Sequence, residues 1–136
     1  MKLSDQVEAA TGADRELDAL IYLALHLPDW RKGSPWKKTN GWFKPDCATD
    51  AMAFFFHDGM GSHKTAPAYT ASIDAALMLV PEGWSWSLGE QRGVGKFRGW
   101  LNDHNTPDGL AVRHVDADAA TPALALCAAA LRARGL

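Results

Sequence analysis

With 136 residues and 47% hydrophobic content, the chain is long enough for one compact domain with a sizeable core and too short for a second domain. Charged residues make up 22% and the formal net charge is -2, so the overall charge indicates neither a nucleic-acid partner nor a membrane surface. We expect no membrane span, because no apolar run approaches the roughly 18 residues that a span needs. The first residues are polar and the two cysteines, Cys47 and Cys127, form no CxxC motif, which is typical of a reduced, cytoplasmic protein.

The first element in chain order is an amphipathic helix within the segment TGADRELDALIYLALHLP. Thr11 and Asp14 have the spacing of a capping box, with Asp in place of the commoner Glu. Apolar residues then recur at helical spacing, at Leu17, Leu20, Ile21, Ala24 and Leu25. Pro28 ends this helix, and the stretch from Asp29 to Lys44 has the turn formers and the missing periodicity of a long ordered loop.

The second half of the chain predicts a helix followed by three strands. Thr70 or Ser72 caps a helix of about ten residues that ends before Pro81. The residues from Trp84 to Leu88 alternate as a strand with one buried face does. VGKFRGWL and GLAVRHVD follow as two more strands, after turns around Gly93 and at NTPDG.

The chain closes with a helix in the segment TPALALCAAALRARGL. Thr121 has the chemistry of an N-cap, Pro122 suits the first helical position, and Arg132 and Arg134 suit the last turn. Cys127 falls on the inner face and is interpreted as a small core residue. Together the elements predict an α+β fold, in which three helices cover one or both faces of a small antiparallel sheet of about three strands.

Three segments of the chain also resemble a known group of proteins: ATGADRELDALIYLAL, PAYTASIDAALMLVPEGWSW and AATPALALCAAALRARG. They are similar to small proteins encoded by temperate phages and prophages, particularly of alphaproteobacteria, the phage αβα-sandwich family. The resemblance covers roughly residues 9–27 and 66–134 and rests on helix and strand ends. It implies a sandwich-like fold and a phage context inside a bacterial host cell, and it implies no reaction. Within one domain spanning 1–136, an insert at about 29–64 matches nothing in that family.

The insert ends in FFFHDGMGSHKT, which has some features of a phosphate-binding loop. A phosphate loop needs GxxxxGK[ST], but His63 stands where the second glycine belongs and Gly59 is one position late for the first. Pro67 and Tyr69 also follow where a helix should begin. We therefore exclude a nucleotide loop, and expect the three preceding phenylalanines to form a short buried strand or turn.

Two kinds of catalytic site are alternatives within the insert. His57, Asp58 and His63 carry metal-ligating side chains, but a six-residue spacing of the histidines is not that of a helical zinc pair. Cys47 has basic neighbours that would lower the pKa of a thiol, and His57 is a candidate base for it, although nothing in the sequence shows that the two meet. A small metal-dependent hydrolase that uses the two histidines is kept as an alternative, and no cofactor is otherwise expected.

A basic segment, residues 30–44 (WRKGSPWKKTNGWFK), has the clearest functional pattern. It holds five basic and no acidic residues, so it carries +5 while the rest of the chain carries -7. It also holds three of the six tryptophans. Cations interleaved with aromatic rings are typical of protein hot spots and of single-stranded nucleic-acid sites. The predicted binding residues are Trp30, Arg31, Lys32, Trp36, Lys37, Lys38, Trp42 and Lys44.

A structural role for the same residues stays open, because a long loop needs aromatic anchors and lysines cover such anchors well. The other tryptophans, Trp84, Trp86 and Trp100, are interpreted as core or sheet-face residues. The leading hypothesis is a non-enzymatic phage accessory protein that binds a protein partner, for example to inhibit a host defence component. A nucleic-acid partner, bound through residues 30–44, is the alternative within the binding class.

Overall fold

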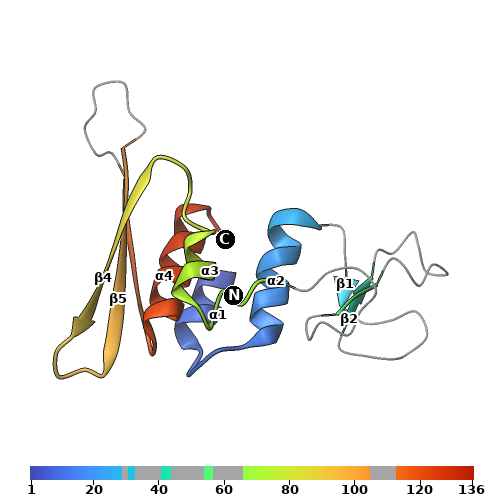
Figure 1. Ribbon diagram of the computed structural model, residues 1–136, viewed down its shortest axis with the longest axis horizontal. Coiled ribbons are helices and arrows are strands. Elements are labelled where there is room, and N and C mark those ends of the chain that lie inside the picture. The colour runs from blue at the N-terminus through green and yellow to red at the C-terminus, as the bar shows by residue number, and fades with distance from the viewer. Residues whose placement is uncertain (29–30, 33–40, 44–53, 57–65, 105–112) are drawn as a thin grey trace. The chain divides into compact units, whose positions relative to one another are not determined.

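The computed structural model describes residues 1–28, 31–32, 41–43, 54–56, 66–104 and 113–136 (Figure 1). The chain forms two compact units, one of Met1–Asp14 with Ala68–Leu136 and one of Arg15–Pro67. The larger unit contains helices α1 (Leu3–Ala9), α3 (Ile73–Leu77) and α4 (Pro122–Ala133). The smaller unit contains α2 (Arg15–His26) and the short strands β1 (Arg31–Lys32), β2 (Gly41–Phe43) and β3 (Phe54–Phe56).

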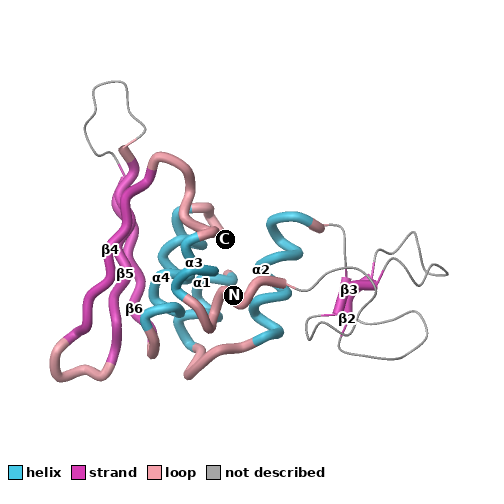
Figure 2. The backbone as a smooth tube through the Cα atoms, viewed as in Figure 1, coloured by secondary structure: helices cyan, strands magenta, loops and turns pink. Residues whose placement is uncertain are grey.

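The sheet of the larger unit consists of three antiparallel strands in the order β4-β5-β6. They are β4 (Trp84–Gln91), β5 (Lys96–Asp103) and β6 (Arg113–Ala119). The described helices of this unit lie on one face of that sheet (Figure 2). This arrangement confirms the predicted α+β class and the small antiparallel sheet.

The turn between β4 and β5 reverses the chain at the predicted place. The N–H of Val94 donates to the carbonyl of Gln91 at 3.3 Å. Gly93 and Gly95 have φ angles of 79° and 69°, in the left-handed region that glycine enters without a steric penalty. Two glycines in a four-residue connection are what allows this hairpin to close.

Helix α4 is the centre of the larger unit. It is capped as predicted, because the Thr121 side chain accepts a hydrogen bond from the N–H of Leu124 at 3.2 Å and Pro122 occupies the first turn. Nearly every residue of the helix is buried, including Cys127, which confirms its interpretation as a core residue. The helix packs against β5 and β6 on one side and against α1 and α3 on others, as an apolar helix buried all round must do.

Small side chains in the sheet let α4 approach closely. Ala117 and Ala119 are almost fully buried beneath the helix, and a Cβ on Gly99 would lie 2.8 Å from the carbonyl oxygen of Ala125. Gly99 therefore has a packing role, since its missing side chain is what makes room for the helix backbone.

Helix α1 was not expected from the sequence. Its residues are mostly polar, and only Ser4 and Val7 are buried. The helix is stabilised by its tertiary contacts with α4 and with the edge of β6, which no periodicity in the first residues indicates.

Helix α3 is half as long as predicted. It has five residues, and the chain then continues in tight turns in which Met78, Leu79 and Val80 each donate to the carbonyl three residues earlier. Hydrogen bonds to the carbonyl three residues earlier keep the apolar side chains on one side of the segment although it is not an α-helix. The apolar periodicity therefore overestimated the length of α3. Of the two predicted caps, Ser72 caps the helix, because its side chain accepts from Ala75 N–H at 3.3 Å.

The other candidate cap, Thr70, is hydrogen-bonded to the backbone of Asp14 instead of capping α3. Its hydroxyl accepts from the N–H of Asp14 at 2.8 Å and donates to the carbonyl of Asp14 at 3.1 Å. Thr70 is buried, so these two bonds satisfy a hydroxyl that would otherwise be costly to bury. Asp14 is the last residue of the larger unit's N-terminal part.

The smaller unit confirms the first predicted helix but not its cap. Helix α2 begins at Arg15, so Thr11 lies too far ahead of it to be its N-cap. Arg15 pairs with the buried Asp18 at 2.8 Å and donates to the Ala66 carbonyl at 2.7 Å, which ties the start of the helix to the end of the insert. Ala19 and Leu23 form a small apolar cluster with Ala66.

The predicted loop at residues 29–44 contains two strands. β1 pairs with β2, and β2 pairs with β3, all antiparallel. Strands of two and three residues are too short to show a period of two in the sequence, and the expectation of a loop was wrong at these positions. The phenylalanine run forms β3, as one of the two structures expected for it. No helix among the described residues is long and apolar enough to cross a membrane.

The fit of α4 on the sheet makes Gly99 a sensitive position. We expect Gly99→Ala to lower the free energy of unfolding by about 1 to 3 kcal/mol, because the added Cβ meets helix backbone that cannot move aside. Denaturant unfolding measures the change. Gly12→Ala is the matched control, since a Cβ there meets nothing within 4 Å. An equal effect of both substitutions would contradict the packing role of Gly99.

Candidate functional site

Most of the predicted binding residues lie outside the described residues. This holds for Trp30, Trp36, Lys37, Lys38 and Lys44. It also holds for the alternative metal ligands His57, Asp58 and His63, and for Cys47. Within the described parts of the chain, no group of three or more His, Cys, Asp or Glu side chains is placed to hold a metal ion.

Three of the predicted binding residues are placed by the backbone of the smaller unit. Arg31 and Lys32 form β1, and Trp42 is the middle residue of β2. The register sets Lys32 opposite Trp42, and Trp42 opposite Phe55. Directly opposite residues of antiparallel strands have Cα atoms only about 4.5 to 5.5 Å apart. Strand pairing thus brings basic and aromatic positions together that are ten residues apart in the sequence.

The tryptophans of the larger sheet divide between its two faces. Trp86 lies opposite Leu101, on the face that α4 covers, yet its side chain is 45% exposed whereas Leu101 is fully buried. The prediction of a buried face for β4 was therefore wrong at Trp86. One helix is too narrow to cover all three strands fully, and α4 packs mainly on β5 and β6 and less on β4.

Trp84 and Trp100 are half-buried, as expected of sheet-face residues. The Arg113 guanidinium carbon lies 5.2 Å from the ring centroid of Trp84, within the range of a cation–π contact. Trp100 lies on the opposite face, where its ring extends over Gly89. Trp86 is thus the exposed functional candidate that sequence reasoning missed, because alternation assigns a residue to a face but does not say how far a helix covers that face.

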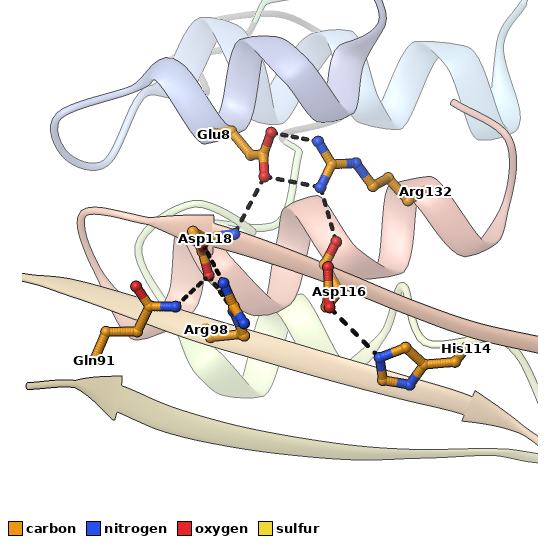
Figure 3. Close-up of polar contacts among 7 residues, drawn as sticks. All are labelled: Glu8, Gln91, Arg98, His114, Asp116, Asp118 and Arg132. Atoms are coloured by element: carbon orange, nitrogen blue, oxygen red, sulfur yellow. Dashed lines mark hydrogen bonds and ion pairs between the residues drawn. The ribbon is translucent and has the colours of Figure 1, made fainter. Parts of the chain in front are cut away.

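A charged cluster lies on the face of the sheet that α4 leaves uncovered (Figure 3). Arg98 on β5 and Asp118 on β6 form a two-pronged pair, with hydrogen bonds of 2.6 and 2.8 Å. Gln91 on β4 donates to the same carboxylate at 3.1 Å, so the cluster links all three strands. The hydrogen bond from Arg98 holds the pKa of Asp118 below its usual range, and the bond from Gln91 adds to this effect.

Histidines on this sheet have hydrogen-bonded partners but no catalytic arrangement. His114 Nδ1 lies 2.8 Å from Asn102, and its Nε2 lies 3.5 Å from a carboxylate oxygen of Asp116. Ser85 Oγ lies 2.8 Å from His104 Nε2. A serine–histidine pair needs a third group that orients the imidazole, and no described carboxylate is hydrogen-bonded to His104. These exposed pairs stabilise cross-strand register rather than resembling a nucleophilic site.

The outer edge of β6 is closed by side chains. Glu8 on α1 accepts from the Asp118 N–H at 3.2 Å, and Arg132 on α4 donates to the Asp116 carbonyl at 2.8 Å. Glu8 and Arg132 are also bonded to each other through both carboxylate oxygens (Figure 3). The bond from Glu8 raises the pKa of Arg132. One ion pair therefore satisfies two backbone groups at the edge of β6 and joins α1, α4 and the sheet.

Among the described strands, none pairs with the outer edge of β4. The N–H of His104 donates to the carbonyl of Gly83, so Gly83 directs its polar groups towards β5. Because these groups alternate along an antiparallel strand, those of Trp84, Trp86, Leu88 and Glu90 point to the other side. Trp84 N–H donates to the Pro81 carbonyl, and no described strand pairs with the remainder.

Two hollows lie among the described residues of the larger unit. One of about 350 Å³ is lined by Lys2, Ser4, Asp5, Arg132, Gly135 and Leu136. The other, of about 240 Å³, lies beside the start of α4 and is lined mainly by small apolar residues and two threonines. The first hollow gathers charged side chains that already pair with each other, since Arg132 lies 3.5 Å from Asp5, and the second offers few polar groups to a ligand.

The pair of Arg98 and Asp118 makes stability depend on pH in the acid range. The pKa of Asp118 is lower in the folded than in the unfolded chain, so its contribution is present above the ordinary value near 3.8 and is lost as the pH falls below it. We expect the melting temperature of Asp118→Asn to fall less steeply than that of the unsubstituted chain between about pH 5 and pH 2, because asparagine has no carboxylate to protonate. Glu90→Gln, at an exposed position, is the control. Equal profiles for Asp118→Asn and the unsubstituted chain would refute the role of this pair.

The contacts of Glu8 and Arg132 at the β6 edge also contribute measurably to the free energy of unfolding. We expect Glu8→Ala to lower the free energy of unfolding by about 1 to 3 kcal/mol, because it leaves the Asp118 N–H and the Arg132 guanidinium without this acceptor. Glu8→Gln keeps an acceptor for the Asp118 N–H and should lose less. Denaturant unfolding of the three proteins gives the order. If Glu8→Ala were as stable as the unsubstituted chain, the edge would not depend on this ion pair.

Comparison with known proteins assigns no function to these residues. No family model, no curated protein and no solved structure matches the chain. The function is therefore inferred from the residues themselves and from the strands that position them.

Proposed function

We propose that this protein is a non-enzymatic phage accessory protein that acts by binding a host protein through the basic segment, residues 30–44. The observation that supports this most directly is the pairing of β1 with β2, which sets Lys32 beside Trp42 and Arg31 beside Phe43. Two cationic and two aromatic positions then share one small sheet. Tryptophan and arginine are the residue types that most often dominate the energy of protein interfaces.

Charge in the segment favours a partner with an acidic surface. Its five basic residues are unopposed by any acidic residue between positions 30 and 44. Such a concentration of positive charge steers an acidic partner during association and mainly raises the on-rate, whereas buried aromatic side chains mainly slow dissociation. The segment has both components, so it suits fast and specific capture of a protein.

The phage context comes from the resemblance of the flanking helices and strands to phage and prophage proteins. It suggests a role in the cytoplasm of the bacterial host, such as inhibition of a defence component. Inhibition by binding needs neither a cofactor nor turnover. A metal-dependent hydrolase built on His57, Asp58 and His63 remains the competing hypothesis, and elemental analysis of protein purified without chelators tests it directly.

Substitution in the basic segment is the direct test of the proposal. We expect Lys37→Ala, Lys38→Ala and Trp42→Ala together to abolish capture of the host partner, while the melting temperature stays nearly unchanged. Immobilised protein, host lysate and quantitative detection of the captured protein measure this. Lys2→Ala with Lys96→Ala removes the same charge outside the segment and should leave capture intact. Capture that survives the triple substitution would rule out the segment as the binding site.

The same assay separates a protein partner from nucleic acid. If all five basic residues contacted phosphates, affinity would fall roughly 500-fold for a duplex and roughly 100-fold for a single strand between about 50 and 200 mM salt, and nuclease treatment would remove the captured material. A protein bound largely through aromatic contacts survives nuclease and weakens much less with salt. Loss under nuclease would replace the proposed protein partner with a nucleic acid.

A further inference from the structure

Within the described parts of the chain, β4 has few of the features that normally protect a sheet edge, and its one charged residue, Glu90, lies near its end. Edge strands are usually short, bulged, covered, or interrupted by proline or lysine. β4 spans eight residues with an unbroken register against β5, and its sequence, WSWSLGEQ, contains no proline and no lysine. The opposite edge, β6, is closed by Glu8 and Arg132. Side chains thus bond to the edge of β6 but leave the edge of β4 accessible, which favours pairing of β4 with another strand.

Exposure of Trp86 gives the open edge an apolar component. Its side chain is 45% exposed beside the outward-pointing backbone groups of the strand. Leu88 is half-buried and lies next to it on the same face. On the other face the strand presents Ser85, Ser87 and Gly89, which are too small to obstruct a neighbouring strand. An added strand could therefore form a hydrogen-bonded ladder and cover the indole at once.

We propose that two copies of this chain pair through β4, antiparallel, about a two-fold axis at Ser87. This pairing goes beyond the binding role of the basic segment and involves none of its residues. A two-fold interface must be self-complementary, with each residue pair occurring twice. The sequence of β4 and of the residues beside it meets this condition in one register.

The register centred on Ser87 sets Trp86 of one copy opposite Leu88 of the other. This pairing covers the exposed indole with an apolar side chain and so removes apolar surface from water. The same register sets Glu90 opposite Trp84. Just beyond the strand it places Arg92 of one copy opposite Glu82 of the other, and both residues are exposed. The two-fold axis makes two such ion pairs, one at each end of the interface.

Neighbouring registers are less favourable. Centring the axis on Trp86 would set Glu90 opposite Glu82, and like charges directly opposite each other are destabilising. Centring it on Leu88 would set the exposed indole of Trp86 opposite the charged Glu90. Charge therefore favours Ser87 over Trp86 as the centre, and the apolar partner that Leu88 gives to the exposed Trp86 favours Ser87 over Leu88.

Sedimentation of the full chain over a wide concentration range tests the pairing. We expect a reversible dimer for the unsubstituted chain. Glu90→Pro removes one outward N–H at an exposed position, and Trp86→Lys places charge where the indole is covered, so each should weaken dimerisation about tenfold or more. Val94→Lys, at an exposed apolar residue of the adjoining turn, should leave the dimer unchanged. Circular dichroism confirms that each variant is folded.

Charge exchange tests the register itself. Arg92→Glu alone should weaken the dimer, because it sets two acidic residues opposite each other, and Glu82→Arg added to it should restore the dimer. A monomer at every concentration, or a dimer that resists both Glu90→Pro and Trp86→Lys, would overturn the proposal. So would failure of the double exchange to restore what Arg92→Glu lost. The triple variant of the basic segment should remain dimeric, which separates this result from the outcome of the partner-capture test.

Discussion

Close packing of α4 against the sheet is the constraint on which the larger unit depends. The helix is apolar on all sides and must be enclosed, and the glycine and alanines of β5 and β6 let its backbone approach the strands. α1 and α3 then cover its remaining sides. A helix centred on β5 and β6 covers β4 only in part, and the exposure of Trp86 follows from this placement.

Polar contacts join the helices and strands of the larger unit in addition to the packing of α4. Glu8 and Arg132 join the first and last helices to the outer edge of β6, so residues far apart in the sequence close one side of the sheet. Arg98, Asp118 and Gln91 link the three strands on the uncovered face. Among the described residues, the sheet thus has one edge bonded by side chains, one edge without a paired strand and a charged face, and the edge of β4 offers backbone groups for binding.

The fold was largely predictable because its signals are local. Thr121 and Pro122 mark the start of α4, and alternation and turn glycines mark the hairpin of β4 and β5. α1 could not be predicted, since a mostly polar helix of seven residues is held by contacts that no local pattern records. The strands of the smaller unit were missed for a related reason: they are shorter than one full alternation, and only their pairing defines them.

By itself, the sequence determined the α+β class, the buried closing helix and the position of a basic, tryptophan-rich segment, because caps, periodicity and charge are properties of neighbouring residues. Only the tertiary structure decided that Lys32 lies beside Trp42, that Glu8 and Arg132 close one edge of the sheet, and that Trp86 is exposed beside the other. The physical reason is the same in each case. Strand pairing and helix placement join residues distant along the chain, and these contacts decide which backbone groups and which aromatic side chains stay accessible to a partner.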